Sequence, residues 1–210
     1  MARQKVWFKK RVKTPTVIQM EAVECGAAAL ASVLAYFGRW VSLEKLRIEC
    51  GVSRDGSKAS NILKAARRYG LIARGFRKEI EDLGDLPLPM ILFWNFNHFV
   101  VLEGYKRGYY YINDPAQGPR KIPAEDFDQA FTGVVLSFEK SKEFTTGGHR
   151  PNTLASLATW LGRAKVALVY VVLASLFLVV PGLLVPTFSK IFVDRILVQQ
   201  MQSWINPLLL

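Results

Sequence analysis

Twenty-four consecutive residues without a charge, 166–189, constrain the fold of this chain more than any other feature. As a helix rising about 1.5 Å per residue, such a run is about 36 Å long, which exceeds the roughly 30 Å hydrocarbon core of a bilayer. A buried core helix is the alternative, but core helices are seldom so long and so apolar on every face. The run therefore predicts a membrane-spanning helix that Pro181 and Pro186 kink or end locally.

Basic residues lie mainly before this apolar run. Residues 1–13 hold six Lys or Arg and no acid, and they contain no apolar stretch of the kind found in signal peptides. Arg163 and Lys165 flank the start of the run, and few charges follow it. Because positive charge marks the cytoplasmic side of a membrane helix, the N-terminal part of the chain is predicted to be cytoplasmic.

The formal net charge of +11 is a feature shared with proteins that bind nucleic acid. Its distribution argues against nucleic acid as a partner, because the excess lies in the N-terminal tail and beside the apolar run, close to anionic lipid head groups. A solvated basic tail explains the same excess equally well. Cys25 and Cys50 fit a reducing compartment and give no disulfide framework. With two distant histidines besides, the chain has no zinc motif.

Between the tail and the apolar run, the hydrophobic period changes from that of helices to that of strands. The predicted helices are 25–37, 43–49, 61–69 and 125–131, and the predicted strands are 71–76, 90–94, 99–105, 109–113 and 134–138. Helices followed by strands predict an α+β domain with a mostly antiparallel sheet.

The predicted organisation has four parts. Residues 1–13 form a mobile basic tail, 14–139 the α+β domain, 140–163 a linker with a juxtamembrane helix at 153–162, and 164–210 the start of a transmembrane domain. The first span covers about 165–189. A second apolar segment begins at Trp204 and is cut short where the chain ends.

Cys25 lies where the first helix of the domain begins. A helix N-terminus stabilises a thiolate through its dipole and its free amides, so this position suits a nucleophile. Gly26 is expected to let a substrate backbone approach closely. A small buried cysteine is the alternative, and Cys50, at an apolar helix end, fits that description well.

His98 and Asp114 have the spacing of partners across a hairpin. His98 begins an apolar strand, whereas His149 lies in the linker and is expected to be inert. Asp114 ends the following strand, so it is predicted to lie beside His98. A half-buried histidine and a turn aspartate before proline are the simpler interpretations of each residue alone. The order Cys, His, Asp, with the last two on paired strands, is that of papain-like peptidases.

Several strings of the domain resemble the motifs of bacteriocin-processing cysteine peptidases. Residues 19–26 (QMEAVECG) resemble the cysteine motif of that family, 97–101 (NHFVV) its histidine motif, 113–115 (NDP) its aspartate motif and 51–56 (GVSRDG) one of its loops. Residues 186–195 resemble the end of the first span in the corresponding exporters. The subgroup linked to nitrile-hydratase-like leaders is the most similar. One departure is Glu24, where many relatives have Asp, and no catalytic consequence is expected from it.

The resemblance implies a papain-like fold over residues 14–139 and a set of catalytic roles. Cys25 would be the nucleophile, His98 its base and Asp114 the group that orients His98. Gln19 would donate its side-chain amide to the oxyanion, beside the backbone N–H of Cys25; by its position alone it is an ordinary loop glutamine. In the family this domain removes leader peptides after a double-glycine-type motif, and the attached ABC exporter releases the product.

The same resemblance implies the partners and the location of the chain. They are a precursor peptide with its leader, membrane lipid, and a second copy of the chain in a complete dimeric exporter of the bacterial cytoplasmic membrane. No cofactor is expected in this chain, because its nearest string to a phosphate-binding loop, 70–77, lacks the Lys and the hydroxyl. ATP is expected only in an ATPase domain that the chain lacks.

Two other functions use the same residues. A domain of this kind can hold a leader without cutting it, although that usually accompanies loss of the cysteine. The same triad can also transfer an acyl group to an amine. For cleavage after glycine, a narrow cleft with aromatic walls is expected, with Trp94 or Phe96 as candidates, and the remaining leader is expected to dock as an amphipathic helix.

Overall fold

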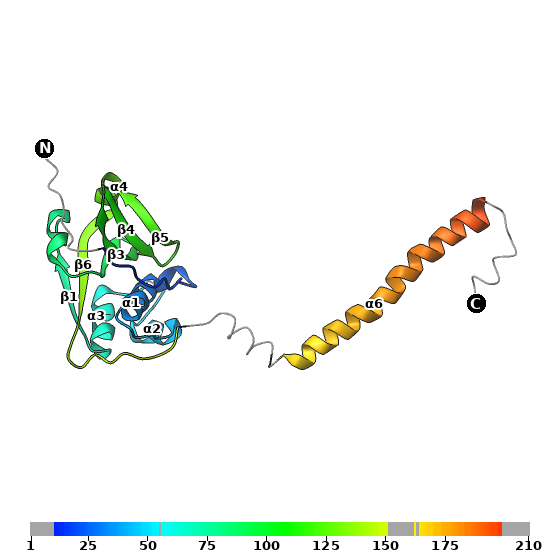
Figure 1. Cartoon of the computed structure of the whole chain (residues 1–210), viewed down its shortest axis with the longest axis horizontal. Helices are drawn as coiled ribbons and strands as arrows, with labels where there is room; N and C mark the ends of the chain where they lie inside the picture. The colour runs from blue at the N-terminus through cyan, green and yellow to red at the C-terminus, as the bar shows by residue number, and fades with distance from the viewer. Residues whose placement is uncertain (1–10, 55, 151–161, 163, 199–210) are drawn as a thin grey trace. The chain divides into compact units, whose positions relative to one another are not determined.

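The computed structural model describes residues 11–54, 56–150, 162 and 164–198. The chain divides into two units, residues 1–150 and 151–210 (Figure 1). In the first unit the helices are η1 (Ala22–Glu24), α1 (Cys25–Tyr36), α2 (Leu43–Glu49), α3 (Ala59–Arg68), η2 (Ile80–Asp85) and α4 (Ala124–Ala130). Its strands are β1 (Leu71–Arg77), β2 (Met90–Trp94), β3 (His98–Lys106), β4 (Tyr109–Asp114), β5 (Gly118–Pro123) and β6 (Phe131–Lys140).

A six-stranded sheet with the order β1-β6-β2-β3-β4-β5 organises the first unit. Each neighbouring pair is antiparallel, and the last strand in sequence, β6, lies between β1 and β2. Hairpins join β2 to β3, β3 to β4 and β4 to β5. The predicted α+β domain with an antiparallel sheet is therefore confirmed.

Each face of this sheet has its own hydrophobic core. On one face, α1, α2 and α3 pack against β1, β2, β3 and β6. On the other face, α4 and η2 cover β2 to β6 through Phe127 and Leu83. Strands buried on both faces are apolar along nearly their whole length, as β2 is, whereas half-exposed strands alternate. The central strands are thus fixed from both sides, and they carry the residues discussed below.

Helix α1 is the central element of the first core. Nearly all of its residues are buried, and they are mostly Ala, Leu and Val. A helix that is apolar on every side must be enclosed by other elements, and α2, α3 and β3 surround it. The N-terminus of α1 is consequently held rigidly against the sheet.

Both ends of the first unit differ from the predicted tail and linker. Residues 11–13 are attached to β3, because the N–H of Val12 donates to the carbonyl of Glu103 at 2.9 Å and Arg11 pairs with the Glu103 carboxylate at 3.4 Å. Residues 141–148 return along the domain instead of leaving it. The rest of the tail, residues 153–161 of the predicted juxtamembrane helix at 153–162, and the second apolar segment lie outside the described residues.

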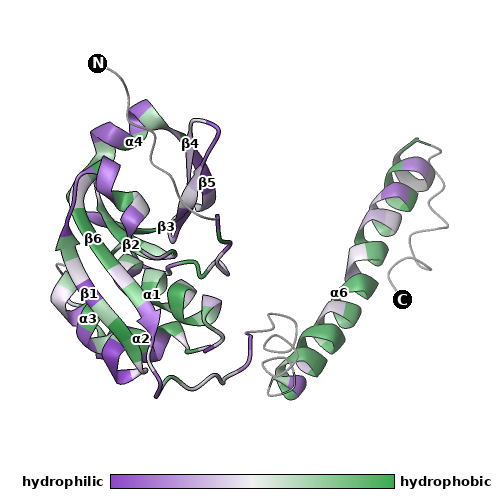
Figure 2. Ribbon diagram, turned by 60° about the vertical axis from the view of Figure 1, so that its left-hand side comes forward, coloured by the Kyte–Doolittle hydropathy of each residue, from purple (hydrophilic) through white to green (hydrophobic). Residues whose placement is uncertain are grey.

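In the second unit, α6 (Lys165–Ile191) continues into the π-helical turn η3 (Phe192–Val198). Pro181 and Pro186 lie inside α6, which runs on past both of them. Hydrophobic residues cover most of its length (Figure 2). By length and composition, Lys165–Asp194 is able to cross a membrane.

Candidate active site

Three separate elements bring Cys25, His98 and Asp114 to one place. Cys25 is the first residue of α1, His98 the first of β3 and Asp114 the last of β4. Because α1 packs against β3, and β3 pairs with β4, the three ends meet at the same edge of the domain. Cys25 and Asp114 are buried, and the His98 side chain is 18% exposed. The predicted neighbours across the hairpin are in contact.

The imidazole of His98 is oriented by the Asp114 carboxylate. Nε2 of His98 lies 2.8 Å from Oδ1 of Asp114. A carboxylate only accepts hydrogen bonds, so Nε2 carries the proton and Nδ1 is the nitrogen available to the thiol. Asp114 is itself held by the N–H of Ala116, which donates to Oδ1 at 2.8 Å, and by Arg120, which donates to Oδ2 at 3.3 Å.

Electrostatics at this edge favour a positively charged ring. Burial lowers the pKa of His98, but hydrogen bonds and charge interactions with Asp114 and Cys25 outweigh it and raise the pKa from 6.5 to about 9. Burial raises the pKa of Asp114, but its bonds to His98, Ala116 and Arg120 bring it below its usual value. Around neutral pH, His98 is therefore an imidazolium beside an ionised Asp114.

Gln19 approaches the same edge from the N-terminal segment. Its backbone N–H donates to the carbonyl of Pro115 at 2.9 Å, directly after Asp114. Its side-chain Oε1 is buried and has no hydrogen-bond partner among the residues that the structure describes. All four residues selected from sequence thus lie on segments that meet at this edge.

The model of the peptidase C39 family matches residues 13–143, well over half of the chain. The chain belongs to the peptidase C39 family. This is a family of cysteine peptidases, so the first unit is a cysteine peptidase domain, here called the C39 domain.

Curated relatives and solved structures agree with this assignment. The colicin V secretion/processing ATP-binding protein CvaB of Escherichia coli is 33% identical over 184 residues, which are 87% of this chain and 26% of that protein. The chain thus spans about a quarter of that relative's length. A crystal structure of a double glycine motif protease from an AMS/PCAT transporter, in complex with the leader peptide, is 59% identical with a TM-score of 0.63. The match covers 63% of this chain and 96% of the solved one.

A second solved structure is the peptidase domain of Streptococcus ComA, a bi-functional ABC transporter involved in a quorum sensing pathway. It is 26% identical to this chain with a TM-score of 0.57, and the match covers 60% of this chain and 98% of that one. These matches confirm the predicted resemblance to bacteriocin-processing peptidases. The subgroup with nitrile-hydratase-like leaders stays a prediction.

Glu24 is a residue whose importance the sequence did not reveal. It is fully buried, and its Oε2 accepts hydrogen bonds from the backbone N–H groups of Met20 at 2.7 Å and Glu21 at 3.0 Å. Its Oε1 lies 2.8 Å from Nε of Arg47, on α2. The carboxylate therefore fixes the loop between Gln19 and Cys25, and its charge is balanced by Arg47. The position of Glu24 one residue before Cys25 was the only available signal.

Gly26 has a packing role that was not expected from the sequence. A Cβ atom at this position would lie 2.7 Å from Cδ1 of Ile62 and 3.0 Å from Cβ of Ser57. The close approach that requires glycine is therefore that of α3 and its preceding loop. The expectation that Gly26 makes room for a substrate backbone stays a prediction beside this packing requirement.

The two aromatic candidates for the cleft walls lie in contrasting environments. Trp94 is 6% exposed and belongs to the core under α4, with its ring centroid 5.2 Å from that of Phe127. Phe96 is 79% exposed in the turn before His98. Asn95 and Phe96 both have positive φ, of 47° and 59°, which is the backbone of a tight hairpin turn. Of the two, only Phe96 presents its ring to solvent next to the site.

Cys50 and Arg120 lie outside the set of four residues predicted for the site. Burial raises the pKa of the Cys50 thiol to about 12, so Cys50 is an unreactive core residue. Arg120 was not selected from sequence, because β5 was not predicted as a strand. Among the described residues, no three His, Cys, Asp or Glu side chains are grouped as metal ligands.

Proposed function

We propose that the C39 domain cleaves a precursor peptide after a double-glycine-type motif, with Cys25 as nucleophile and His98 as its acid and base. The observation that carries the proposal is the 2.8 Å bond between His98 and Asp114 next to the thiol at the start of α1. It is supported by the 59% identity to a double glycine motif protease solved with a leader peptide.

The reaction follows from this geometry. The Cys25 sulfur, paired with the His98 imidazolium, attacks the carbonyl carbon of the second small residue, and a tetrahedral oxyanion forms. The Gln19 amide and the backbone N–H of Cys25 donate to that oxyanion. His98 gives its proton to the leaving amine, and the C–N bond breaks. Water then attacks the thioester, His98 takes a proton from it, and the acid product leaves Cys25.

The remaining expectations are part of the same proposal. The leader is recognised as part of a precursor peptide, and the released peptide is exported by an ABC transporter whose ATP site lies in its ATPase domain. Such a transporter is a homodimer, with α6 in the bacterial cytoplasmic membrane in contact with lipid. The excess of basic residues before α6 supports a cytoplasmic position for the C39 domain.

The test is mass spectrometry of a synthetic double-glycine leader incubated with the 210-residue chain in a neutral detergent. A single cut after the second small residue is expected, and Cys25→Ala should abolish it. Cys50→Ala is the matched control, because it removes the other, buried thiol and should leave cleavage in place. An intact leader bound by the wild-type chain would favour the non-cleaving binding module instead.

The role of Gln19 needs a kinetic measurement. Removing one oxyanion donor typically lowers kcat by about a hundred- to a thousandfold. Gln19→Ala should therefore lower kcat over that range with little change in KM. Equal cleavage rates for Gln19→Ala and the wild-type chain would remove Gln19 from the oxyanion hole.

A further inference from the structure

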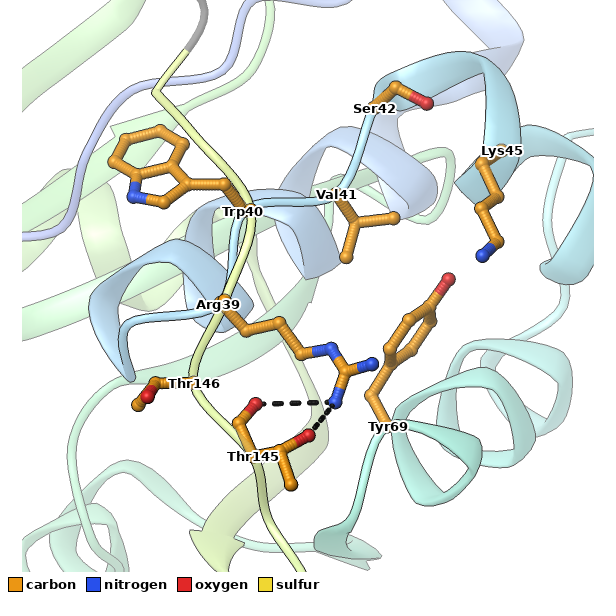
Figure 3. A pocket seen from close by; sticks show the side chains of 10 residues that line it. Arg39, Trp40, Val41, Ser42, Lys45, Tyr69, Thr145 and Thr146 are labelled. Carbon is orange, nitrogen blue, oxygen red and sulfur yellow. Dashed lines mark hydrogen bonds between the residues drawn. The ribbon is translucent and has the colours of Figure 1, made fainter.

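A pocket of about 260 Å³ lies on the C39 domain away from the residues of the candidate active site (Figure 3). It is formed by the segment after α1, the start of α2, the end of α3 and the returning segment 145–148. Cys25 is at the first residue of α1 and the pocket begins after its last. Twelve residues of helix at about 1.5 Å each separate the two sites by roughly 18 Å. The pocket is therefore distinct from the catalytic edge.

Two cations of the pocket are directed at the same aromatic ring. Cζ of Arg39 lies 4.9 Å from the ring centroid of Tyr69, and Nζ of Lys45 lies 5.9 Å from it. Figure 3 shows Arg39 beside the ring and Lys45 near its hydroxyl. Arg39 is also fixed by Nη1, which donates to Oγ1 and O of Thr145 at 2.6 and 3.2 Å. Its guanidinium is thus oriented before any ligand arrives, which reduces the entropy lost on binding.

The residues that line this pocket include cations and no carboxylate. None of its lining residues is acidic, and neither Arg39 nor Lys45 has an ion pair within the described part of the chain. One acid beside the pocket is Glu49, whose Oε1 accepts a hydrogen bond from the Tyr69 hydroxyl at 2.9 Å. Burial and that bond raise the pKa of Tyr69, so the phenol stays neutral. The pocket consequently keeps two positive charges at neutral pH.

Two further cations adjoin the same segment. Nζ of Lys140 lies 5.7 Å from the ring centroid of Phe37, and Cζ of Arg150 lies 6.0 Å from that of Trp40. Each is placed on an aromatic ring and has no carboxylate partner among the described residues. Four cations lie around residues 37–45, a segment that contains one acid, Glu44, so the local charge is positive and favours an anion.

We propose that this pocket binds a phosphate group. Arg39 uses only Nη1 in hydrogen bonds to described residues, so Nη2 and Nε remain for phosphate oxygens, with Lys45 as a point charge and the Ser42 hydroxyl as a further donor. The volume of about 260 Å³ lies below the range for whole drug-sized ligands, about 300–1,000 Å³, and therefore suits a head group. The phosphate belongs either to an anionic lipid or to a soluble anion.

The bound phosphate has a structural consequence for the returning segment. Thr145 and Gly147 hold this segment to Arg39 and Trp40, since the N–H of Trp40 donates to the carbonyl of Gly147 at 2.8 Å. A ligand on Arg39 and Lys45 lies between this segment and α2. Its binding stabilises the attachment of residues 145–148 to the domain.

The test is a titration of the 210-residue chain in a neutral detergent at constant ionic strength. The two probes are inorganic phosphate and soluble dihexanoyl phosphatidylglycerol, and binding is measured by calorimetry. We expect saturable binding of one equivalent per chain. Tighter binding of the lipid identifies a head group, and tighter binding of inorganic phosphate identifies a soluble anion.

The variants distinguish a specific phosphate site from non-specific attraction of anions to a basic surface. Lys45→Gln removes the positive charge of a side chain that makes no hydrogen bond to described residues, so the fold should be retained. Arg39→Gln tests the cation that Thr145 holds in place. Each should weaken binding by at least about tenfold, the loss of one charge-assisted contact. Lys121→Gln is the matched control, because Lys121 lies on the Tyr109 ring at 3.8 Å, outside this pocket. Absence of saturable binding, or equal weakening by Lys121→Gln and Lys45→Gln, would overturn the proposal.

Discussion

Nε of Arg47 lies 2.8 Å from Oε1 of Glu24, whose carboxylate is fully buried one residue before Cys25. The other oxygen of that carboxylate holds two backbone N–H groups of the loop that begins at Gln19. The pair connects α2 to the loop that carries the proposed oxyanion donor. Glu24 and Arg47 do not contact the reacting atoms, so both are positioning residues.

Replacement of Glu24 by Ala should reduce both stability and turnover. The variant leaves two loop N–H groups without their acceptor and Arg47 without its charge partner. Breaking a buried pair typically costs about 3–5 kcal/mol, and the partial exposure of Arg47 places the expected loss of unfolding free energy near the lower end. Denaturant unfolding measures this loss, and cleavage kinetics should show a lower kcat with a smaller change in KM.

Glu21→Gln is the matched control for Glu24→Ala. Glu21 is in the same loop, but its side chain is exposed and lies 3.6 Å from Arg47. Exposed ion pairs contribute about 0–1 kcal/mol, so little change is expected. If Glu24→Ala altered KM alone, or left kcat at the wild-type value, the buried carboxylate would have no part in positioning the oxyanion donor.

The pH dependence of cleavage should show an alkaline limit set by His98. The pKa of the ring is raised to about 9, so the imidazolium, and the stability it gives, is fully present below 6.5 and lost as pH rises through about 9. Asp114→Asn removes the interactions by which Asp114 raises this pKa and leaves those of Cys25. The alkaline limb of kcat/KM should therefore move to lower pH in Asp114→Asn, in addition to a lower maximum. An unshifted limb would show that another group sets it.

Trp94 and Phe96 should respond differently to replacement by Ala. Trp94 is packed in the core, so Trp94→Ala is expected to cost about 3–5 kcal/mol of unfolding free energy. Phe96 is exposed, so Phe96→Ala should leave stability nearly unchanged and relax the requirement for glycine in the leader. Thermal unfolding and cleavage of leaders with Gly→Ala replacements measure the two effects. Relaxed selectivity in Trp94→Ala, with none in Phe96→Ala, would reverse this assignment.

Gly26→Ala should destabilise the contact of α1 with α3. The new Cβ would overlap Cδ1 of Ile62, which is fully buried, and overpacking of this kind typically costs about 1–3 kcal/mol. Ile62→Val deletes that Cδ1 atom, so the double variant should recover part of the loss seen in Gly26→Ala. Additive losses in the double variant would place the strain elsewhere.

The sequence predicted the residues whose positions depend on strand ends. His98 begins a strand and Asp114 ends the next one, and hairpin pairing alone brings such positions together. The residues that it missed depend on contacts between distant segments. Glu24 meets Arg47 only because α2 folds against the start of α1, and neither residue has a local pattern that marks it. Likewise, the packing role of Gly26 becomes visible only when α3 is placed beside it.

Strand β5 was not predicted, because its residues have low β-strand propensity. It contains Pro119 and Pro123 together with Arg120 and Lys121, a composition that disfavours strands. At the edge of the sheet its unpaired side needs no N–H donors, so proline is tolerated there. The burial of Trp94 was not predicted either, because the predicted strand 90–94 is apolar on both faces and does not show that α4 covers Trp94.

The returning segment 145–148 determines where mechanical load enters the C39 domain. Gly147 pairs in parallel with Arg39, and Gly148 is so close to the Trp40 carbonyl that no side chain fits. Tension along the chain from residues after 150 therefore acts on the segment behind α1 before it reaches β6. That helix runs directly to Cys25 and is enclosed by α2, α3 and β3, so close packing resists its displacement and holds the thiol in place when load is applied at its far end.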